Sequence, residues 1–143
     1  YEVRGTKYEV RSTRYEVRSE RTILMEDRKA FLRELLQCFD TSLAAYRTYI
    51  SEGKTFRNAC LLKINNEQAL ALLSNHSAIL PDIYQPDVIA LADHYSTWKS
   101  KWEQLAAQTN PGPDDVFVFP NDITFPRESA VRLEKYYASL KQD

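Results

Sequence analysis

Gly53-Lys54-Thr55 has the residue types that end a phosphate-binding loop, in which backbone N–H groups and a lysine hold the phosphates of a nucleotide. The full motif also requires a glycine five residues before Gly53, where this chain has Thr48, and a strand before the loop, where the pattern predicts a helix. We therefore interpret Gly53 as the end of one helix and Thr55 as the N-cap of the next. The sequence predicts no nucleotide site and no other cofactor.

Ser96 and Lys99 have the spacing that places a lysine one helical turn from a serine nucleophile. Enzymes of that kind carry further Ser-Asp-Asn and Lys-Thr-Gly elements, and this chain contains neither. Both residues also flank Trp98, which the helical pattern places in the core, so we expect Ser96 and Lys99 at the surface. We predict no catalytic residue from this pair.

His76 and His94 are the only histidines. A metal site needs such side chains close to further His, Cys or carboxylate ligands, and no spacing here is typical of a zinc or di-iron site. A helical ribonuclease would need an arginine about one turn from a histidine, but the nearest arginine before His76 is Arg57. We therefore predict no metal ion, and we expect a protein that is not an enzyme.

Cys38 and Cys60 are the only cysteines, which is too few for a disulfide framework or a zinc site. They are typical of free thiols in a reducing compartment. No stretch approaches the roughly 20 apolar residues that span a bilayer, and the N-terminus lacks the apolar core of a secretory signal. The sequence predicts a cytoplasmic protein that makes no membrane contact.

Aromatic residues are the strongest candidates for a binding surface. Three of them recur three and four residues apart along a predicted helix, and three phenylalanines make the following loop apolar. Such side chains either fill a core or form the centre of a protein interface, and the sequence leaves both alternatives open. The candidate partner surface consists of Tyr95, Trp98, Trp102, Phe117, Phe119 and Phe125.

Three near-copies of a seven-residue unit begin at Tyr1, Tyr8 and Tyr15, and the only methionine, Met25, follows them. We interpret residues 1–24 as a repeat-derived extension and expect the functional chain to begin at Met25. The spacing of Tyr and Val fits a strand, whereas the basic residues recur as on one face of a helix. We expect the extension to be disordered or loosely attached, with a helical continuation or a strand as alternatives.

The net charge of −1 divides unevenly along the chain. The extension through Thr22 has six basic and four acidic residues and so carries +2, which leaves −3 for the rest. An acidic body lacks the electrostatic footprint of polyanion binding, so nucleic-acid contact is only an alternative function. Its candidate contacts are Arg4, Lys7, Arg11, Arg14, Arg18 and Arg21 of the extension, with Arg57, Lys63, Lys99 and Lys101 scattered over the body.

Apolar spacings of three and four predict amphipathic helices throughout residues 25–143. The first ends at Gly53 and carries acidic residues in its first turn, as the helix dipole favours. The second is capped by Thr55 and is interrupted, in one interpretation, around Asn65 and Asn66. The apolar stripe of the first helix is Leu32, Leu35, Leu36, Phe39, Leu43, Tyr46 and Ile50.

Proline and glycine divide the second half of the chain. Pro86 is suited to the first position of a third helix, and the run 110–113 ends that helix. Residues 116–119 form a short apolar extended segment, too short for a sheet unless it pairs with the extension, and Pro126 opens a fourth helix. The predicted fold is all-α, an up-and-down bundle of about four helices. We predict a non-catalytic protein-interaction or accessory module, with a protein partner or a homo-oligomer.

Overall fold

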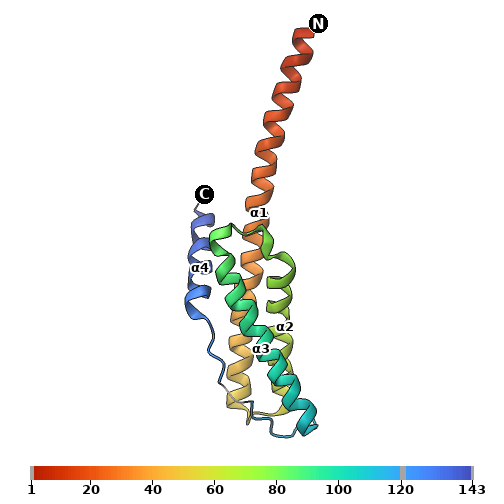
Figure 1. Ribbon diagram of the computed structural model, residues 1–143, viewed down its shortest axis with the longest axis vertical. Helices are drawn as coiled ribbons and strands as arrows, with labels where there is room; N and C mark the ends of the chain where they lie inside the picture. The colour runs from red at the N-terminus through yellow and green to blue at the C-terminus, as the bar shows by residue number, and fades with distance from the viewer. Residues whose placement is uncertain (1, 120–121, 143) are drawn as a thin grey trace.

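The chain folds as a bundle of helices (Figure 1). A computed structural model describes residues 2–119 and 122–142, with side chains from residue 19 onward. Within that part of the chain there is no strand, and Thr55 and Val116 form an isolated β-bridge. The predicted all-α bundle is confirmed. Its elements are α1 (Glu2–Ser51), α2 (Phe56–His76), η1 (Ser77–Ile79), η2 (Asp82–Tyr84), α3 (Gln85–Thr109) and α4 (Arg127–Lys141).

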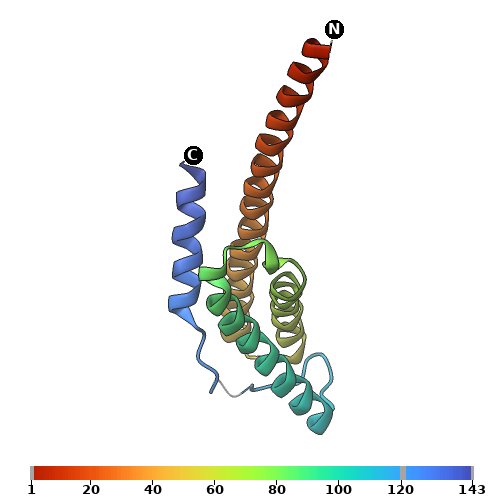
Figure 2. The ribbon, with the colours of Figure 1, turned by 45° about the horizontal axis from the view of Figure 1, so that its top comes forward.

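Successive helices run up and down, and each packs against two others (Figures 1 and 2). α1 contacts α2 and α4, and α3 also contacts α2 and α4, so the four helices close a ring. α4 has only 15 residues and covers the upper part of the bundle in Figure 1. Below α4, this side of the bundle is formed by the connection from α3 to α4. We call this connection the α3–α4 loop; its described residues are 110–119 and 122–126.

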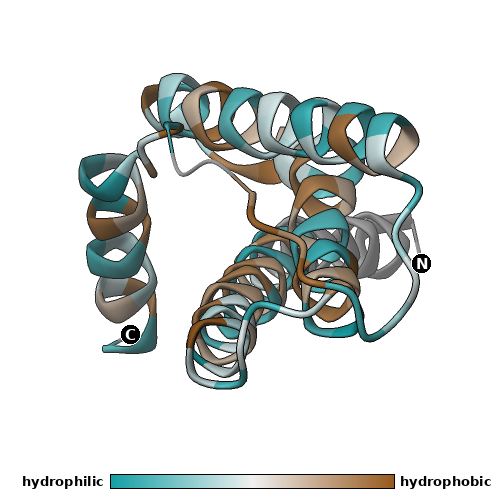
Figure 3. Ribbon diagram, turned by 90° about the horizontal axis from the view of Figure 1, so that it is seen from below, coloured by the Kyte–Doolittle hydropathy of each residue, from teal (hydrophilic) through white to brown (hydrophobic). Residues whose placement is uncertain are grey.

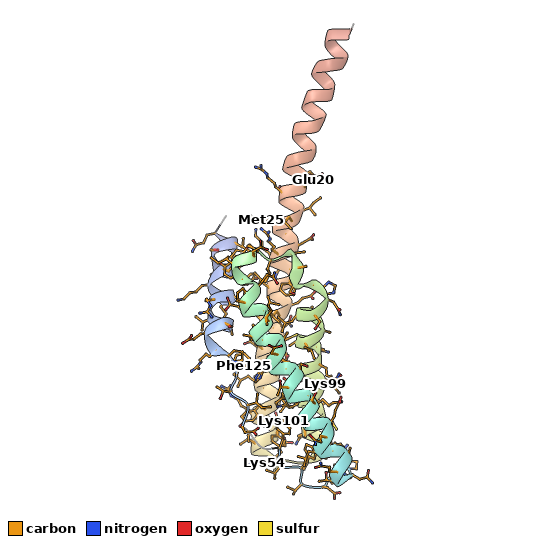
Figure 4. All side chains as sticks on the ribbon, viewed as in Figure 1. Glu20, Met25, Lys54, Lys99, Lys101 and Phe125 are labelled. Atoms are coloured by element: carbon orange, nitrogen blue, oxygen red, sulfur yellow. The ribbon has the colours of Figure 1, made fainter. Side chains whose placement is uncertain are left out.

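α1 is one helix of 50 residues, about 75 Å long at 1.5 Å per residue. The part before Met25 extends beyond the other helices (Figure 4). The repeats from Glu2 onward thus continue the helix, as in one of the alternatives above. The separate, loosely attached extension over residues 1–24 and the start at Met25 stay predictions. None of the described helices combines the length and apolar character that crossing a membrane requires.

The junction between α1 and α2 consists of a helix end followed directly by a helix cap. Gly53 has φ 89°, and the Lys54 N–H donates to the Tyr49 carbonyl at 3.0 Å, which is the hydrogen bond of a Schellman C-cap. The Thr55 hydroxyl accepts from the Asn58 N–H at 3.4 Å. Both predicted capping roles are confirmed, and the resemblance to a phosphate-binding loop has this structural explanation.

α2 and α3 depart from the sequence predictions at two points. α2 is continuous, so the suggested break around Asn65 and Asn66 is wrong. The Asn65 side chain donates to the Leu61 carbonyl one turn earlier, and Asn66 is buried, so both residues are accommodated in the helix. α3 begins one residue before Pro86, and it ends as predicted, with Asn110 in a left-handed conformation at φ 43°.

The buried side chains form two clusters. The upper cluster joins all four helices, and the lower cluster joins α1, α2, α3 and the α3–α4 loop. Seen from below, apolar residues of the loop cross between the helices (Figure 3). The upper cluster is Phe31, Leu32, Leu35, Ala69, Leu73, Leu80, Val88, Leu91, Tyr95, Leu133 and Leu140. The lower cluster is Tyr49, Ala59, Leu62, Trp98, Trp102 and Phe117.

Candidate functional site

A cavity of about 860 Å³ lies beside the lower cluster and reaches the first turns of α4. All four helices and the α3–α4 loop contribute to its wall. Its volume falls within the range of small-molecule sites in proteins. The buried part of the wall includes Ser42, Tyr49, Leu62, Asn66, Tyr95, Trp98 and Trp102, and the exposed part includes Leu43, Tyr46, Ile50, Phe125 and Val131.

Three polar atoms stand out in this mainly apolar wall. Among the side chains that the structure describes, the buried polar atoms without a hydrogen-bond partner are Ser42 Oγ, His94 Nδ1 and Trp102 Nε1. All three residues line this one cavity. Because an unpaired buried polar group costs free energy, such atoms are uncommon in proteins and call for a functional or structural explanation.

His94 lies on α3 between aromatic rings. Its ring meets Tyr95 at 5.0 Å between centroids and Phe125 at 5.2 Å, both edge to face. Burial lowers the pKa of His94, and the backbone of Thr124 opposes that shift in part. The neutral imidazole is therefore favoured at neutral pH, so His94 presents this site with a polar but uncharged group.

Tyr49 fixes the α3–α4 loop at the lower end of the cavity. Its buried hydroxyl donates to the Phe117 carbonyl and accepts from the Phe119 N–H at 3.2 Å. The Phe117 N–H in turn donates to the Lys54 carbonyl at 2.8 Å. These bonds place the Phe119 ring 5.3 Å from that of Trp98, so the loop supplies an aromatic part of the wall.

An exposed apolar strip on α1 forms the outer edge of the cavity. It consists of Leu43, Tyr46 and Ile50, whose exposed fractions are 49%, 37% and 45%. The sequence pattern predicted these three residues in the core, and this prediction is wrong. They are exposed because α4 covers only the upper part of the bundle and does not reach this part of α1 (Figure 1). Asp40 and Lys54 lie at the two ends of the strip and also line the cavity.

The structure buries most of the aromatic residues that the sequence offered as a partner surface. Tyr95, Trp98, Trp102 and Phe117 are buried, Phe119 is partly buried, and Phe125 remains exposed. All except Phe117 line the cavity. Phe125 lies where the loop reaches α4 (Figure 4).

Sequence reasoning did not single out Ser42 or the strip. One signal could have indicated the exposed strip: α1 has apolar residues outside the predicted stripe as well. Tyr49 is such a residue, and it belongs to the lower cluster. A helix with apolar residues on more than one face must either be surrounded or leave one of these faces open.

The other candidates for chemistry lie apart from this site. His76 is exposed and borders a groove between α1 and α2, whereas His94 lines the cavity. Ser96 is exposed, and Lys99 pairs with Glu103 at 4.0 Å. In the described part of the chain, no three His, Cys, Asp or Glu side chains are grouped so that they could hold a metal ion.

The two cysteines are free and half-buried. Burial raises the pKa of the Cys38 thiol, with a smaller contribution from Glu34. Burial also raises the pKa of the Cys60 thiol, although Lys63 opposes that shift. Both thiols therefore favour the protonated form, which is the less reactive one.

The scattered basic residues of the body are engaged with acidic neighbours. Arg57 pairs with Asp114 at 3.2 Å, and Lys101 pairs with Asp122 at 3.2 Å. Lys63 lies 2.9 Å from Glu67 and also contacts Glu103, which Lys99 shares. In the extension, Arg21 is exposed, and the side chains of Arg4, Lys7, Arg11, Arg14 and Arg18 lie outside the described ones.

No family model, no curated protein and no solved structure matches this chain. The cavity and the strip are the features of the molecule that point to a function.

Proposed function

We propose that this protein is a non-catalytic interaction module that self-associates through the strip of Leu43, Tyr46 and Ile50. The observation that carries the proposal is the exposure of three large apolar side chains along two turns of one helix. Contiguous apolar surface of this kind is typical of interaction sites. α4 packs on α1 in the same bundle, so a further helix could pack on the strip in the same way.

The occupant is a second copy of the chain, packed antiparallel on the strip about a two-fold axis. An isologous contact of this kind pairs residue i with j and j with i. With the axis near Tyr46, Leu43 of one copy lies opposite Ile50 of the other. The same register brings Asp40 opposite Lys54, and neither side chain has an ion-pair partner among the described residues. Opposite charges at the ends of the strip thus favour the antiparallel register.

The cellular setting belongs to the proposal as well. Two free cysteines support a cytoplasmic protein, because thiols stay reduced there. We do not extend the proposal to nucleic acid, since the basic residues of the body that were candidates for it are paired with carboxylates.

The test is the molar mass of the full chain in solution, measured by light scattering after gel filtration over a range of concentrations. We expect the mass to rise toward that of a dimer as concentration increases. The variant Leu43→Lys with Ile50→Lys should remain monomeric, because it places charges on the strip. Leu61→Lys with Ile64→Lys is the matched control, since these residues are equally exposed on α2. It should dimerise like the wild type.

A charge exchange tests the register. Asp40→Lys alone and Lys54→Asp alone should each weaken the dimer, because each places like charges opposite one another. The double exchange should restore it. A chain that stays monomeric at every concentration would refute the proposal, as would a dimer indifferent to both sets of changes.

A further inference from the structure

The cavity has properties that the contact between two copies does not use. Ser42, His94 and Trp102 approach it from two helices, and each holds a buried polar atom without a partner. His94 and Trp102 are two turns apart on α3, about 12 Å along the helix axis. The polar groups therefore span a length comparable to that of a small organic molecule rather than marking a single point.

We infer that the cavity binds an uncharged, mainly aromatic small molecule that carries a hydrogen-bond acceptor such as a carbonyl oxygen. The aromatic class follows from the rings around the cavity, which include Tyr95, Trp98 and Phe119. The acceptor follows from Trp102, because an indole N–H can only donate. Ser42 can donate or accept, and so can neutral His94, depending on its tautomer.

Charge argues against an ionic ligand. Among the residues that the structure describes at the wall, the ionisable ones other than His94 and the tyrosines are two acidic and two basic: Asp40, Glu134, Lys54 and Arg127. Three of these four are exposed and Lys54 is half-exposed, so no charged side chain is buried in the cavity to receive an ion. Burying an unpaired ion would cost more than the apolar contacts return.

Binding includes a small adjustment of the wall. The three polar atoms are covered by neighbouring protein atoms, so the side chains must rotate slightly to reach a ligand. Tryptophan emission reports changes in this wall, because both tryptophans of the chain, Trp98 and Trp102, line this cavity. A ligand should therefore change the intrinsic fluorescence of the protein.

The experiment titrates the full chain with prodan, a neutral aromatic ketone whose emission moves to shorter wavelength in apolar surroundings. We expect saturable binding with a Kd on the order of 10 µM, with a matching change in tryptophan emission. Acetylnaphthalene and ethylnaphthalene then compete for the site, since they share one shape and differ in the carbonyl group. We expect the ketone to compete better.

Trp102→Phe removes the donor and keeps an aromatic ring, so it should abolish the preference for the ketone, a change of about fivefold to tenfold. Trp98→Phe is the control, because it makes the same change on the same wall and the Trp98 ring nitrogen is not among the buried polar atoms without a partner. This variant should keep the preference for the ketone. If Trp102→Phe does not fold, Ser42→Ala gives a second test, because it removes one oxygen atom. The loss of the Ser42 hydroxyl should reduce the preference for the ketone as well.

Two results would overturn the inference: no saturable change in either emission, or the same preference for the ketone in the wild type and in every folded variant. The inference does not depend on self-association. Running the titration with protein well below the concentrations that give a dimer separates the two, because a failure of either then leaves the other standing.

Discussion

Tyr49 and Phe117 lie 68 residues apart in the chain, yet the hydroxyl of one donates to the carbonyl of the other. The same hydroxyl accepts from the Phe119 N–H, so one oxygen atom joins the end of α1 to the α3–α4 loop. Tyr49→Phe leaves both backbone groups without this partner. We expect it to lower the free energy of unfolding by about 2 kcal/mol, measured by denaturation in urea.

Tyr46→Phe is the control for this prediction. Tyr46 lies on the same helix and is exposed, and its substitution makes the identical chemical change away from the hydroxyl that joins α1 to the loop. It should change the free energy of unfolding by less than about 0.5 kcal/mol. Equal effects of the two substitutions would contradict the role given to the Tyr49 hydroxyl.

Asp87 and Arg132 connect α3 to α4. The Asp87 carboxylate is buried and accepts from Arg132 Nε at 2.8 Å and from its terminal nitrogen at 2.7 Å. Asp87→Ala removes this connection, and we expect a loss of about 2 kcal/mol in the free energy of unfolding. Asp93→Ala, at an exposed position of α3, should have little effect. A loss at Asp93 as large as that at Asp87 would argue against this ion pair as the cause.

Leu35 and Leu43 are two leucines of one helix with opposite surroundings. Leu35 is fully buried in the upper cluster, whereas Leu43 belongs to the exposed strip. Leu35→Ala should lower the free energy of unfolding by about 3 kcal/mol, because it removes buried surface and leaves a void. Leu43→Ala should cost less than about 1 kcal/mol when the chain is monomeric. Thermal unfolding of dilute protein measures both, and similar losses would contradict the assigned burial.

His94 makes stability depend on pH. Burial lowers its pKa in the folded protein below the ordinary value of 6.5. The unfolded chain therefore binds the proton more readily, so the stability from this residue is complete above about pH 6.5 and declines as the pH falls toward the folded pKa. We expect the decrease in Tm between about pH 7.5 and pH 5.5 to be smaller in His94→Gln than in the wild type.

His76→Gln serves as the control for the pH dependence, because His76 is exposed at the end of α2. It should show the same decrease in Tm as the wild type. If His94→Gln loses as much stability on acidification as the wild type does, another group is responsible.

The sequence predicted the helices well because local signals determine them. Gly53, Thr55 and the run after Thr109 marked helix ends through backbone conformation and capping, which depend on few neighbours. The suggested break at Asn65 failed because a side chain hydrogen bond to the backbone one turn earlier is compatible with a continuous helix.

The site was harder to predict because it depends on where one helix stops relative to another. The spacing of Leu43, Tyr46 and Ile50 is that of a buried stripe, and only the late start of α4 leaves them exposed. Ser42 and Trp102 gave no sign in the sequence that their polar atoms would lack partners, since this depends on every atom around them.

The two buried clusters are crossed by the same three helices. α1, α2 and α3 each pass from the upper cluster into the lower one without interruption, and the α3–α4 loop also contacts both, through Phe125 above and Phe117 below. The two clusters should therefore unfold together on heating, because the same three helices contribute buried side chains to both. Calorimetry should consequently record a single unfolding peak whose van't Hoff and measured enthalpies agree.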